Sequence, residues 1–385
     1  MKKRVKIKAY IAGNLGDDLF IELLCSRYPE AQFDLCGSKK FSSLYKPISN
    51  LKYYSYDTHF VRMRMAIYRC LAKAVNFICS REVLSQMTTD VAQNRKYEKY
   101  ADINVYITGS GFMNGVEERE LSAQKRAEER RYYNLHPYLL GCNFGPYAHD
   151  AYLEMYQELF QDTSDLCFRD SYSLRLFPTV KTARVAADIV FCYPIEKVRS
   201  ERVLLSENYL LISVANLAKD KDTASGYVED YIQMLKRLVA DRNNRHLHTV
   251  LLGFCKEQGD DLAISTVLDG IVCPELNHVY CYPDISKLQA LRLCLDADFV
   301  LATRYHAMIL ALLFGKKVCP ICYSEKVTHV LADISPDAKY VTLEDLKQLD
   351  ISQLECEKTT QISEEQRKAL IASANTQFRA LDQVL

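Results

Sequence analysis

Short apolar runs alternate with amphipathic stretches along the first half of the chain. Near the start, apolar Val5 and Ile7 alternate with Lys6 and Lys8, which is the two-residue period of a β-strand. Strands that alternate with helices favour a mainly parallel sheet covered on both faces. The predicted strands are residues 5–11, 32–36, 51–55, 104–108, 138–142, 166–168 and 183–185, and the predicted helices are 18–27, 62–79 and 152–161.

A polar, charged connector at 194–202 separates this half from a second one with the same alternation. We therefore expect an α/β protein with two Rossmann-like domains, residues 1–195 and 203–355, which face a cleft in a GT-B-like arrangement. Residues 363–385 have helical propensity and could pack back on the first domain. In the second half, the predicted strands are 209–214, 247–252, 279–281, 299–302 and 317–321, and the predicted helices are 228–239, 263–268, 285–294 and 307–314.

Length and charge agree with this division. A chain of 385 residues is too long for one ordinary core, so two domains are expected. The 49 Lys and Arg residues balance the 49 Asp and Glu residues, and this zero net charge gives no reason to expect nucleic-acid binding. Nearly half of the residues are apolar, which excludes a disordered chain.

The cysteine pattern indicates a reducing compartment. Fourteen cysteines are spread along the chain, mostly in apolar stretches where they serve as small core residues. Cys319 and Cys322 form a CxxC, but they lie in an apolar run with no second pair nearby. No other ligand set has metal-binding spacing, so we expect neither a metal nor a cofactor. The start lacks a signal-peptide core, and no apolar run is long enough to span a membrane, which favours the cytoplasm.

Glycine-rich segments follow three of the predicted strands. In open α/β sheets, ligands bind beyond the carboxyl ends of the strands. Small residues there let the backbone approach a ligand, and a helix N-terminus attracts an anion. Ordinary turns, with Asp17 or Asp18 capping a helix, are the alternative. The candidates for the acceptor or its loops are Asn14, Gly16, Asp17, Gly109, Ser110, Gly111 and Asn143.

Cationic residues follow three more strands. Arg169 ends one strand, and its planar guanidinium can hold a carboxylate or phosphate bidentately, although a local pair with Asp170 is the alternative. Arg304 and His306 stand between an apolar strand and an apolar helix, which places a cation and an imidazole where an anion would bind. Three residues after the next strand could complete this anion site: Tyr323, Ser324 and Lys326.

In this order, the segments resemble the polysaccharide pyruvyl transferase family across residues 12 to 330. One departure is Ser110, where the family often has a third glycine. The matching motifs are Asn-x-Gly-Asp from Asn14, Gly-x-Gly from Gly109, Asn-x-Gly-Pro from Asn143, Arg-Asp-x-x-Ser from Arg169, a turn containing Asp188, Arg-Tyr-His-Ala from Arg304, Gly-Lys-Lys from Gly315 and Tyr-Ser-Glu-Lys from Tyr323.

The resemblance implies a GT-B-like fold and an enzyme that transfers pyruvate from phosphoenolpyruvate onto a sugar as a ketal. It also implies that Arg169, Arg304 and His306 hold the donor, and we expect His306 to act as an acid or base. On this basis the first domain takes the acceptor and the second takes the donor. The alternatives are a nucleotide-sugar-dependent glycosyltransferase, because fold alone does not decide the donor, and a non-catalytic subunit of a polysaccharide assembly complex.

The acceptor is expected to be a saccharide of a surface polysaccharide or its lipid-linked precursor. Residues 61–78 mix basic and apolar positions at helical spacing, as an interfacial helix would, so peripheral membrane contact is a further expectation. An ordinary domain helix with arginines on its wet face is the alternative. The sequence indicates neither the sugar that is modified nor the oligomeric state.

Overall fold

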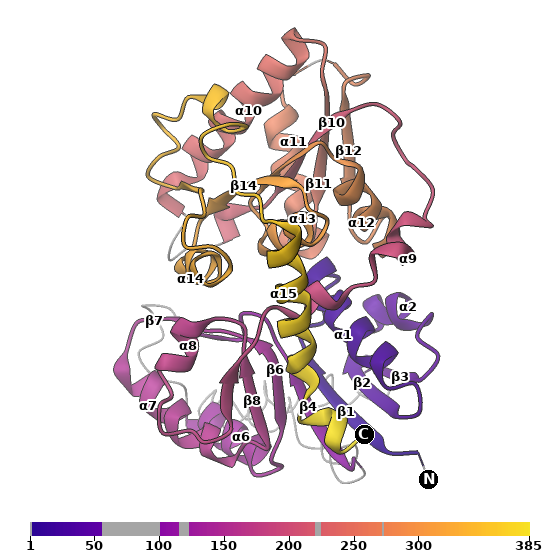
Figure 1. The fold of residues 1–385 in the computed structure, drawn as a ribbon, viewed down its shortest axis with the longest axis vertical. Helices are drawn as coiled ribbons and strands as arrows, with labels where there is room; N and C mark the ends of the chain where they lie inside the picture. The colour runs from indigo at the N-terminus through magenta and orange to yellow at the C-terminus, as the bar shows by residue number, and fades with distance from the viewer. Residues whose placement is uncertain (1, 56–100, 115–122, 220–224, 272) are drawn as a thin grey trace, which may run out of the picture.

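The structure, a computed structural model, describes residues 2–55, 101–114, 123–219, 225–271 and 273–385. Two parallel sheets lie one above the other, and the chain crosses from the first to the second once before its C-terminal helix returns (Figure 1). The helix predicted at 62–79 and the possible membrane-contact segment at 61–78 lie outside the described residues. In the part of the chain that is described, no helix is both long and apolar enough to span a bilayer.

The first sheet has seven strands, all paired in parallel. Their order across the sheet is β3 (Leu51–Ser55), β2 (Gln32–Gly37), β1 (Arg4–Ala9), β4 (Ile103–Ile107), β6 (Tyr138–Cys142), β8 (Asp165–Phe168) and β9 (Ala183–Val185). The α-helices among the described residues of this half are α1 (Leu15–Arg27), α2 (Ser42–Tyr45), α6 (Ala123–Tyr133), α7 (Asp150–Leu159) and α8 (Ser171–Arg175).

The second sheet has six strands, also in parallel, and every residue of its central strand β10 is buried. Their order is β12 (Asn277–Cys281), β11 (His248–Gly253), β10 (Tyr209–Val214), β13 (Phe299–Ala302), β14 (Lys317–Cys322) and β15 (Val341–Thr342). The helices are α9 (Ile195–Arg199) in the connector, α10 (Val228–Asn244), α11 (Asp260–Leu268), α12 (Lys287–Asp296), α13 (Tyr305–Leu313), α14 (Glu325–Ile334) and α15 (Glu364–Asn375).

Two helices begin at residues other than the predicted ones, because a capping side chain fixes the position of the first turn. The first helix begins at Leu15 rather than at residue 18, because the Asn14 side chain accepts the Gly16 N–H. The helix predicted from 285 begins at Lys287, because Ser286 and Gln289 form a capping box. The elements that were not predicted include the short helices α2, α8 and α9, the helix α14, the strand β15, and the strands β5 (Phe112–Asn114) and β7 (Phe144–Tyr147), which pair in a separate small sheet.

One apolar cluster spans both halves, and each half has a further cluster of its own. A continuous cluster of buried side chains includes Leu19 and Phe20 from α1 and extends to Ala307 and Ile309 in α13. Hydrogen bonds join the halves at the same place, since the Leu15 N–H donates to the Phe254 carbonyl at 3.0 Å. The two sheets are therefore held at a packed joint, and the cleft next to that joint has fixed walls.

Candidate functional site

A cleft of about 510 Å³ opens between the two halves at the carboxyl ends of their strands. Segments from both sheets line it, as expected for ligand sites in open parallel sheets. Ten residues that the sequence singled out line this cleft: Asn14, Asp17, Gly109, Ser110, Gly111, Arg169, Arg304, His306, Tyr323 and Lys326. Three others do not: Gly16 and Asn143 lie behind the lining, and Ser324 is the N-cap position of α14.

Gly16 gives His306 its place. A Cβ atom at Gly16 would lie 1.8 Å from the Nδ1 atom of His306, so the imidazole rests directly on the backbone of α1. The same ring packs against Phe20 in a T-shaped arrangement, with the ring centroids 5.2 Å apart. A glycine in the first turn of α1 is thus required by a side chain from the other half of the molecule.

His306 is an uncharged imidazole at neutral pH. Burial lowers its pKa to about 4, although the nearby Asp188 carboxylate acts in the opposite direction. Its Nε2 atom lies 3.9 Å from Oδ2 of Asp188 and makes no hydrogen bond to any described residue. This ring nitrogen is buried, and an uncharged imidazole with an unpartnered nitrogen can take up or relay a proton when a donor or acceptor reaches it.

Arg169 belongs to a buried polar cluster beneath the first glycine-rich loop. Its guanidinium donates to Oδ2 of Asp188 at 3.0 Å and to Oδ1 of Asn143 at 2.7 Å. The guanidinium carbon also stands 4.0 Å from the centroid of the Tyr305 ring. Only 2% of the Arg169 side chain is exposed, so Asp188 and Asn143 fix the direction of its remaining donors.

Gly109 lets the loop after β4 lie on this guanidinium. A Cβ atom at Gly109 would be only 3.2 Å from Nη2 of Arg169. The adjacent Ser110 hydroxyl accepts from Nη2 at 3.3 Å, so a serine in place of a glycine here adds a polar contact to the cluster.

Arg304 is held from the opposite side by a carboxylate that the sequence analysis did not select. Asp260, fully buried at the start of α11, accepts from Nε at 3.0 Å and from Nη2, while Gln258 accepts from Nη1. Asp260 also accepts the N–H groups of Phe254 and Cys255, which follow β11. The strand-end rule that selected Arg304 would have pointed to this loop as well, but nothing in its composition marks the aspartate.

Asp17 is the cleft carboxyl that titrates near neutrality. It lies half-buried in the first turn of α1 and lines the cleft with Arg169 and His306. Burial, followed by the neighbouring Asp18 carboxylate, raises the pKa of Asp17 to about 7. The sequence analysis placed Asp17 with the acceptor loops, and the structure adds a carboxyl that can carry a proton at physiological pH.

The segment from the end of β14 to the first turn of α14 forms another wall of the cleft. Tyr323 and Lys326 line the cleft, with the Lys326 ammonium 5.4 Å from the centroid of the Tyr323 ring. At the edge of this wall the ring of Tyr172 stacks on His329 at 3.9 Å, which joins α8 to α14 across the two halves. Among the described residues, no three His, Cys, Asp or Glu side chains are grouped so that they could hold a metal ion.

Comparisons with known proteins agree with this architecture. No curated protein matches the chain in sequence. Among solved structures, a protein described as a UDP-N-acetylglucosamine 2-epimerase from Listeria monocytogenes matches with 10% identity and a TM-score of 0.52. The UDP complex of S. aureus MnaA matches with 10% identity and a TM-score of 0.51. Each match covers 100% of this chain and 95% of the other. These likenesses show the fold alone, and they confirm the predicted GT-B-like α/β arrangement.

The family comparison covers the site itself. The sequence model of the polysaccharide pyruvyl transferases matches residues 14–325, from the N-cap of α1 to the first residue of α14. This range contains nearly all of the cleft-lining segments and confirms the resemblance carried by the motifs. The chain belongs to the polysaccharide pyruvyl transferase family.

Proposed function

We propose that this protein transfers the pyruvyl group of phosphoenolpyruvate onto a saccharide and forms a cyclic ketal. The observation that carries the proposal is the meeting of Arg169, Arg304, Lys326, His306 and Asp17 in one cleft between the two halves. Phosphoenolpyruvate bears a phosphate and a carboxylate on a three-carbon skeleton. Three cations and two proton-exchanging groups suit a small dianionic or trianionic enol ester that must be protonated to react.

The reaction balances without a cofactor. The methylene carbon of the donor takes up a proton, and a saccharide hydroxyl oxygen forms a bond to C2. The C2–O bond to phosphate then breaks, and a second hydroxyl of the same saccharide closes the ketal ring. Of the two hydroxyl protons, one replaces the proton given to the new methyl group and the other leaves with inorganic phosphate.

The arginines are preorganised for this donor. Asp188 and Asn143 orient Arg169, and Asp260 and Gln258 orient Arg304, before any ligand binds. Donors that are already fixed need no reorganisation as charge moves from the enol oxygen to the departing phosphate. Lys326 carries its charge on a flexible four-carbon stem, so it is suited to follow the phosphate.

Asp17 and His306 divide the proton transfers between them. A carboxyl with a pKa of about 7 is partly protonated at neutral pH, whereas an imidazole with a pKa of about 4 is free to accept a proton. Burial is the main cause of both shifts, and at neutral pH it leaves the carboxyl partly protonated and the imidazole unprotonated, as an acid and a base require. We therefore assign Asp17 to protonate the methylene carbon and His306 to deprotonate the attacking hydroxyl.

The acceptor is proposed to enter beside Tyr10, whose side chain is 45% exposed at the edge of the cleft. An exposed aromatic ring with a polar tip suits a sugar ring, which offers both C–H faces and hydroxyls. A surface polysaccharide unit or its lipid-linked precursor, modified on the cytoplasmic side of the membrane, fits the family to which the chain belongs.

The test compares phosphoenolpyruvate with a panel of nucleotide sugars by thermal shift, on wild type and on Arg304→Ala. A ligand at 100 times its Kd stabilises the folded protein by about 2.7 kcal/mol. We expect stabilisation by phosphoenolpyruvate alone, lost in Arg304→Ala. The control is Arg242→Ala, because Arg242 is also a largely buried, ion-paired arginine of the second half but does not line the cleft.

A saccharide panel then decides the reaction, with release of inorganic phosphate as the readout. Phosphate release that requires both phosphoenolpyruvate and a saccharide supports the proposal. Stabilisation by a nucleotide sugar, with none by phosphoenolpyruvate, would reverse it in favour of a glycosyltransferase. Donor binding without phosphate release across a broad panel would instead identify a non-catalytic subunit.

A further inference from the structure

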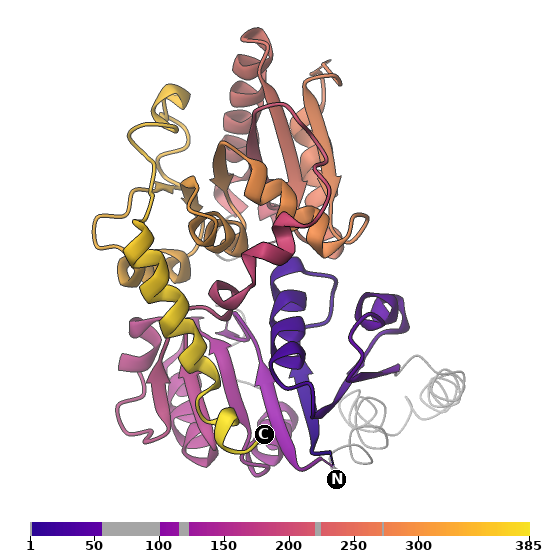
Figure 2. The same ribbon diagram turned by 45° about the vertical axis from the view of Figure 1, so that its right-hand side comes forward.

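The C-terminal segment buries a polar side chain inside the first half of the molecule. After α15 the chain continues as a short helix η8 (Thr376–Phe378), which contacts β6. Figure 1 shows this C-terminal segment lying across the first sheet. Figure 2 shows the same segment running along the lower domain toward the C-terminus. Gln377 is fully buried there, although glutamine is usually exposed. A buried side-chain amide destabilises the folded protein unless its donors and acceptors are hydrogen-bonded.

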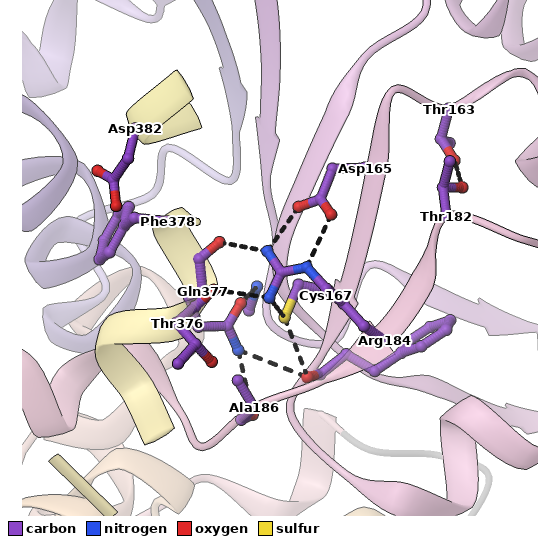
Figure 3. Close-up of polar contacts among 12 residues, drawn as sticks. Thr163, Asp165, Cys167, Thr182, Arg184, Ala186, Thr376, Gln377, Phe378 and Asp382 are labelled. Carbon is purple, nitrogen blue, oxygen red and sulfur yellow. Dashed lines mark hydrogen bonds and ion pairs between the residues drawn. The ribbon is translucent and has the colours of Figure 1, made fainter. Parts of the chain in front are cut away.

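Arg184 of β9 holds the segment in place, as Figure 3 shows. Its guanidinium forms two hydrogen bonds to the Asp165 carboxylate, both of 2.7 Å. The same group donates to the carbonyl oxygens of Thr376 and Gln377, again at 2.7 Å. Arg184 thus anchors the backbone of η8 to the first sheet through charge-assisted hydrogen bonds. The Gln377 side chain takes no part in this anchoring.

The Gln377 amide makes hydrogen bonds at three strand ends through both its oxygen and its nitrogen. Its Oε1 atom accepts the N–H of Gly141 at 3.0 Å. Its Nε2 atom donates to the carbonyl oxygens of Ala187 at 3.1 Å and Ala186 at 3.2 Å, and it lies 3.5 Å from that of Phe168. One side chain from the C-terminal segment therefore links the last residues of β6 and β8 with the segment after β9.

These contacts lie directly next to the donor cluster. Phe168 precedes Arg169, Ala187 precedes Asp188, and Gly141 stands two residues before Asn143. Arg169, Asp188 and Asn143 are the three residues whose mutual hydrogen bonds direct the guanidinium toward the cleft. The Ser373 hydroxyl of α15 adds a fourth support, because it accepts the N–H of Ala187 at 3.0 Å.

We infer that Gln377 is a positioning residue for the donor site: it sets the relative positions of the strand ends that carry Arg169, Asp188 and Asn143. The inference rests on the proposed function for its consequence, which is the binding of phosphoenolpyruvate. A misplacement of about 1 Å at a reacting centre is enough to change turnover by roughly 10²-fold, so three strand ends joined through one amide are a sensitive point. The C-terminal segment is then part of the active site although it does not line the cleft.

The test uses Gln377→Met in the full chain, because methionine keeps the volume and removes every polar contact. The matched control is Asp382→Asn, which weakens the attachment of the same segment through Arg27 and Tyr28 but lies away from the strand ends. We expect the KM for phosphoenolpyruvate to rise by about tenfold in Gln377→Met, with a smaller change in kcat and no change in KM for Asp382→Asn. If Gln377→Met fails to fold, Gln377→Glu keeps the acceptor for Gly141 and takes its place.

Hydrogen exchange of the unliganded protein separates this inference from the proposed function. In Gln377→Met the amides at residues 141–143, 168–170 and 187–190 should exchange faster, and in Asp382→Asn they should not. Unchanged exchange at these residues, or equal changes in both variants, would overturn the positioning role whatever the substrate is. Absence of phosphoenolpyruvate binding by the wild type would instead overturn the proposed function and leave the exchange result to decide on Gln377.

Discussion

At the scale of single residues, we expect the addition of one methyl group at Gly16 to displace His306 from the site. Alanine is a better helix former than glycine by about 1 kcal/mol, so Gly16→Ala should favour α1 by itself. However, the added Cβ would overlap His306, which must leave its place against the helix. We expect Gly16→Ala to lower kcat by about 10²-fold, the loss typical of a missing general base, while the protein stays folded.

The measurement is steady-state phosphate release together with thermal unfolding. Gly226→Ala is the matched control, because a Cβ at that glycine has no atom within 4 Å. Full activity in Gly16→Ala would mean that the place of His306 on α1 is unimportant, and the role assigned to its imidazole would then be wrong.

The titration of Asp17 and His306 predicts a bell-shaped dependence of kcat/KM on pH. Activity should fall below about pH 4 as His306 is protonated, and above about pH 7 as Asp17 loses its proton. Asp17→Asn should lower the rate. It should also remove the part of the decrease in kcat/KM at alkaline pH that is caused by titration of the enzyme. Because the phosphate of the donor itself titrates near pH 6, the difference between the two profiles carries the assignment. An alkaline limb identical in Asp17→Asn would show that another group supplies the proton.

At the scale of elements, Asp260 connects the loop after β11, the start of α11 and the start of α13 through one carboxylate. Asp260→Asn removes the buried charge that pairs with the largely buried Arg304 and turns an amide N–H toward backbone donors. The loss of one partner from a buried ion pair costs about 3–5 kcal/mol. We expect a lower free energy of unfolding and a higher KM for phosphoenolpyruvate, measured by urea titration and steady-state kinetics.

A double-mutant cycle with Arg304→Ala separates the ion pair from the other contacts of Asp260. If the pair is the main interaction, the double variant should be destabilised by less than the sum of the single variants. Additive losses would show that Asp260 acts on the backbone of its loop and does not hold Arg304.

The elements also show how far the sequence could be used. Apolar runs located every strand of the two large sheets except β15, because buried strands such as β10 are apolar at nearly every position. They could not show β5 and β7, since three- and four-residue strands in glycine-rich segments have no periodicity to detect. The donor-site candidates Arg169, Arg304 and His306 were found because each follows an apolar run in the sequence. Asp260 and Gln377 were missed, because their importance comes from contacts 44 and 209 residues away along the chain.

At the scale of the whole molecule, the joint between the halves predicts how the protein unfolds. The fully buried Asp18 carboxylate of α1 accepts hydrogen bonds from the hydroxyls of Tyr45 in the first half and Tyr282 in the second, the latter at 2.6 Å. The apolar core is continuous across the same joint. The two halves should therefore unfold together, although two-domain chains of this length often do not.

Tyr282→Phe tests the joint with the loss of one oxygen atom. It leaves the Asp18 carboxylate buried with one donor fewer, which should cost about 1–3 kcal/mol. In scanning calorimetry we expect one transition in both proteins, at a lower Tm in the variant, because each half is stabilised by the other across the joint. Tyr53→Phe is the control, since its hydroxyl bonds within the first half, to the Ser38 carbonyl. If Tyr282→Phe split the unfolding into two transitions, or shifted only one of two transitions already present in the wild type, the halves would be independent units. The cleft between them would then have movable walls, and the preorganisation assigned to Arg169 and Arg304 would depend on closure around the donor.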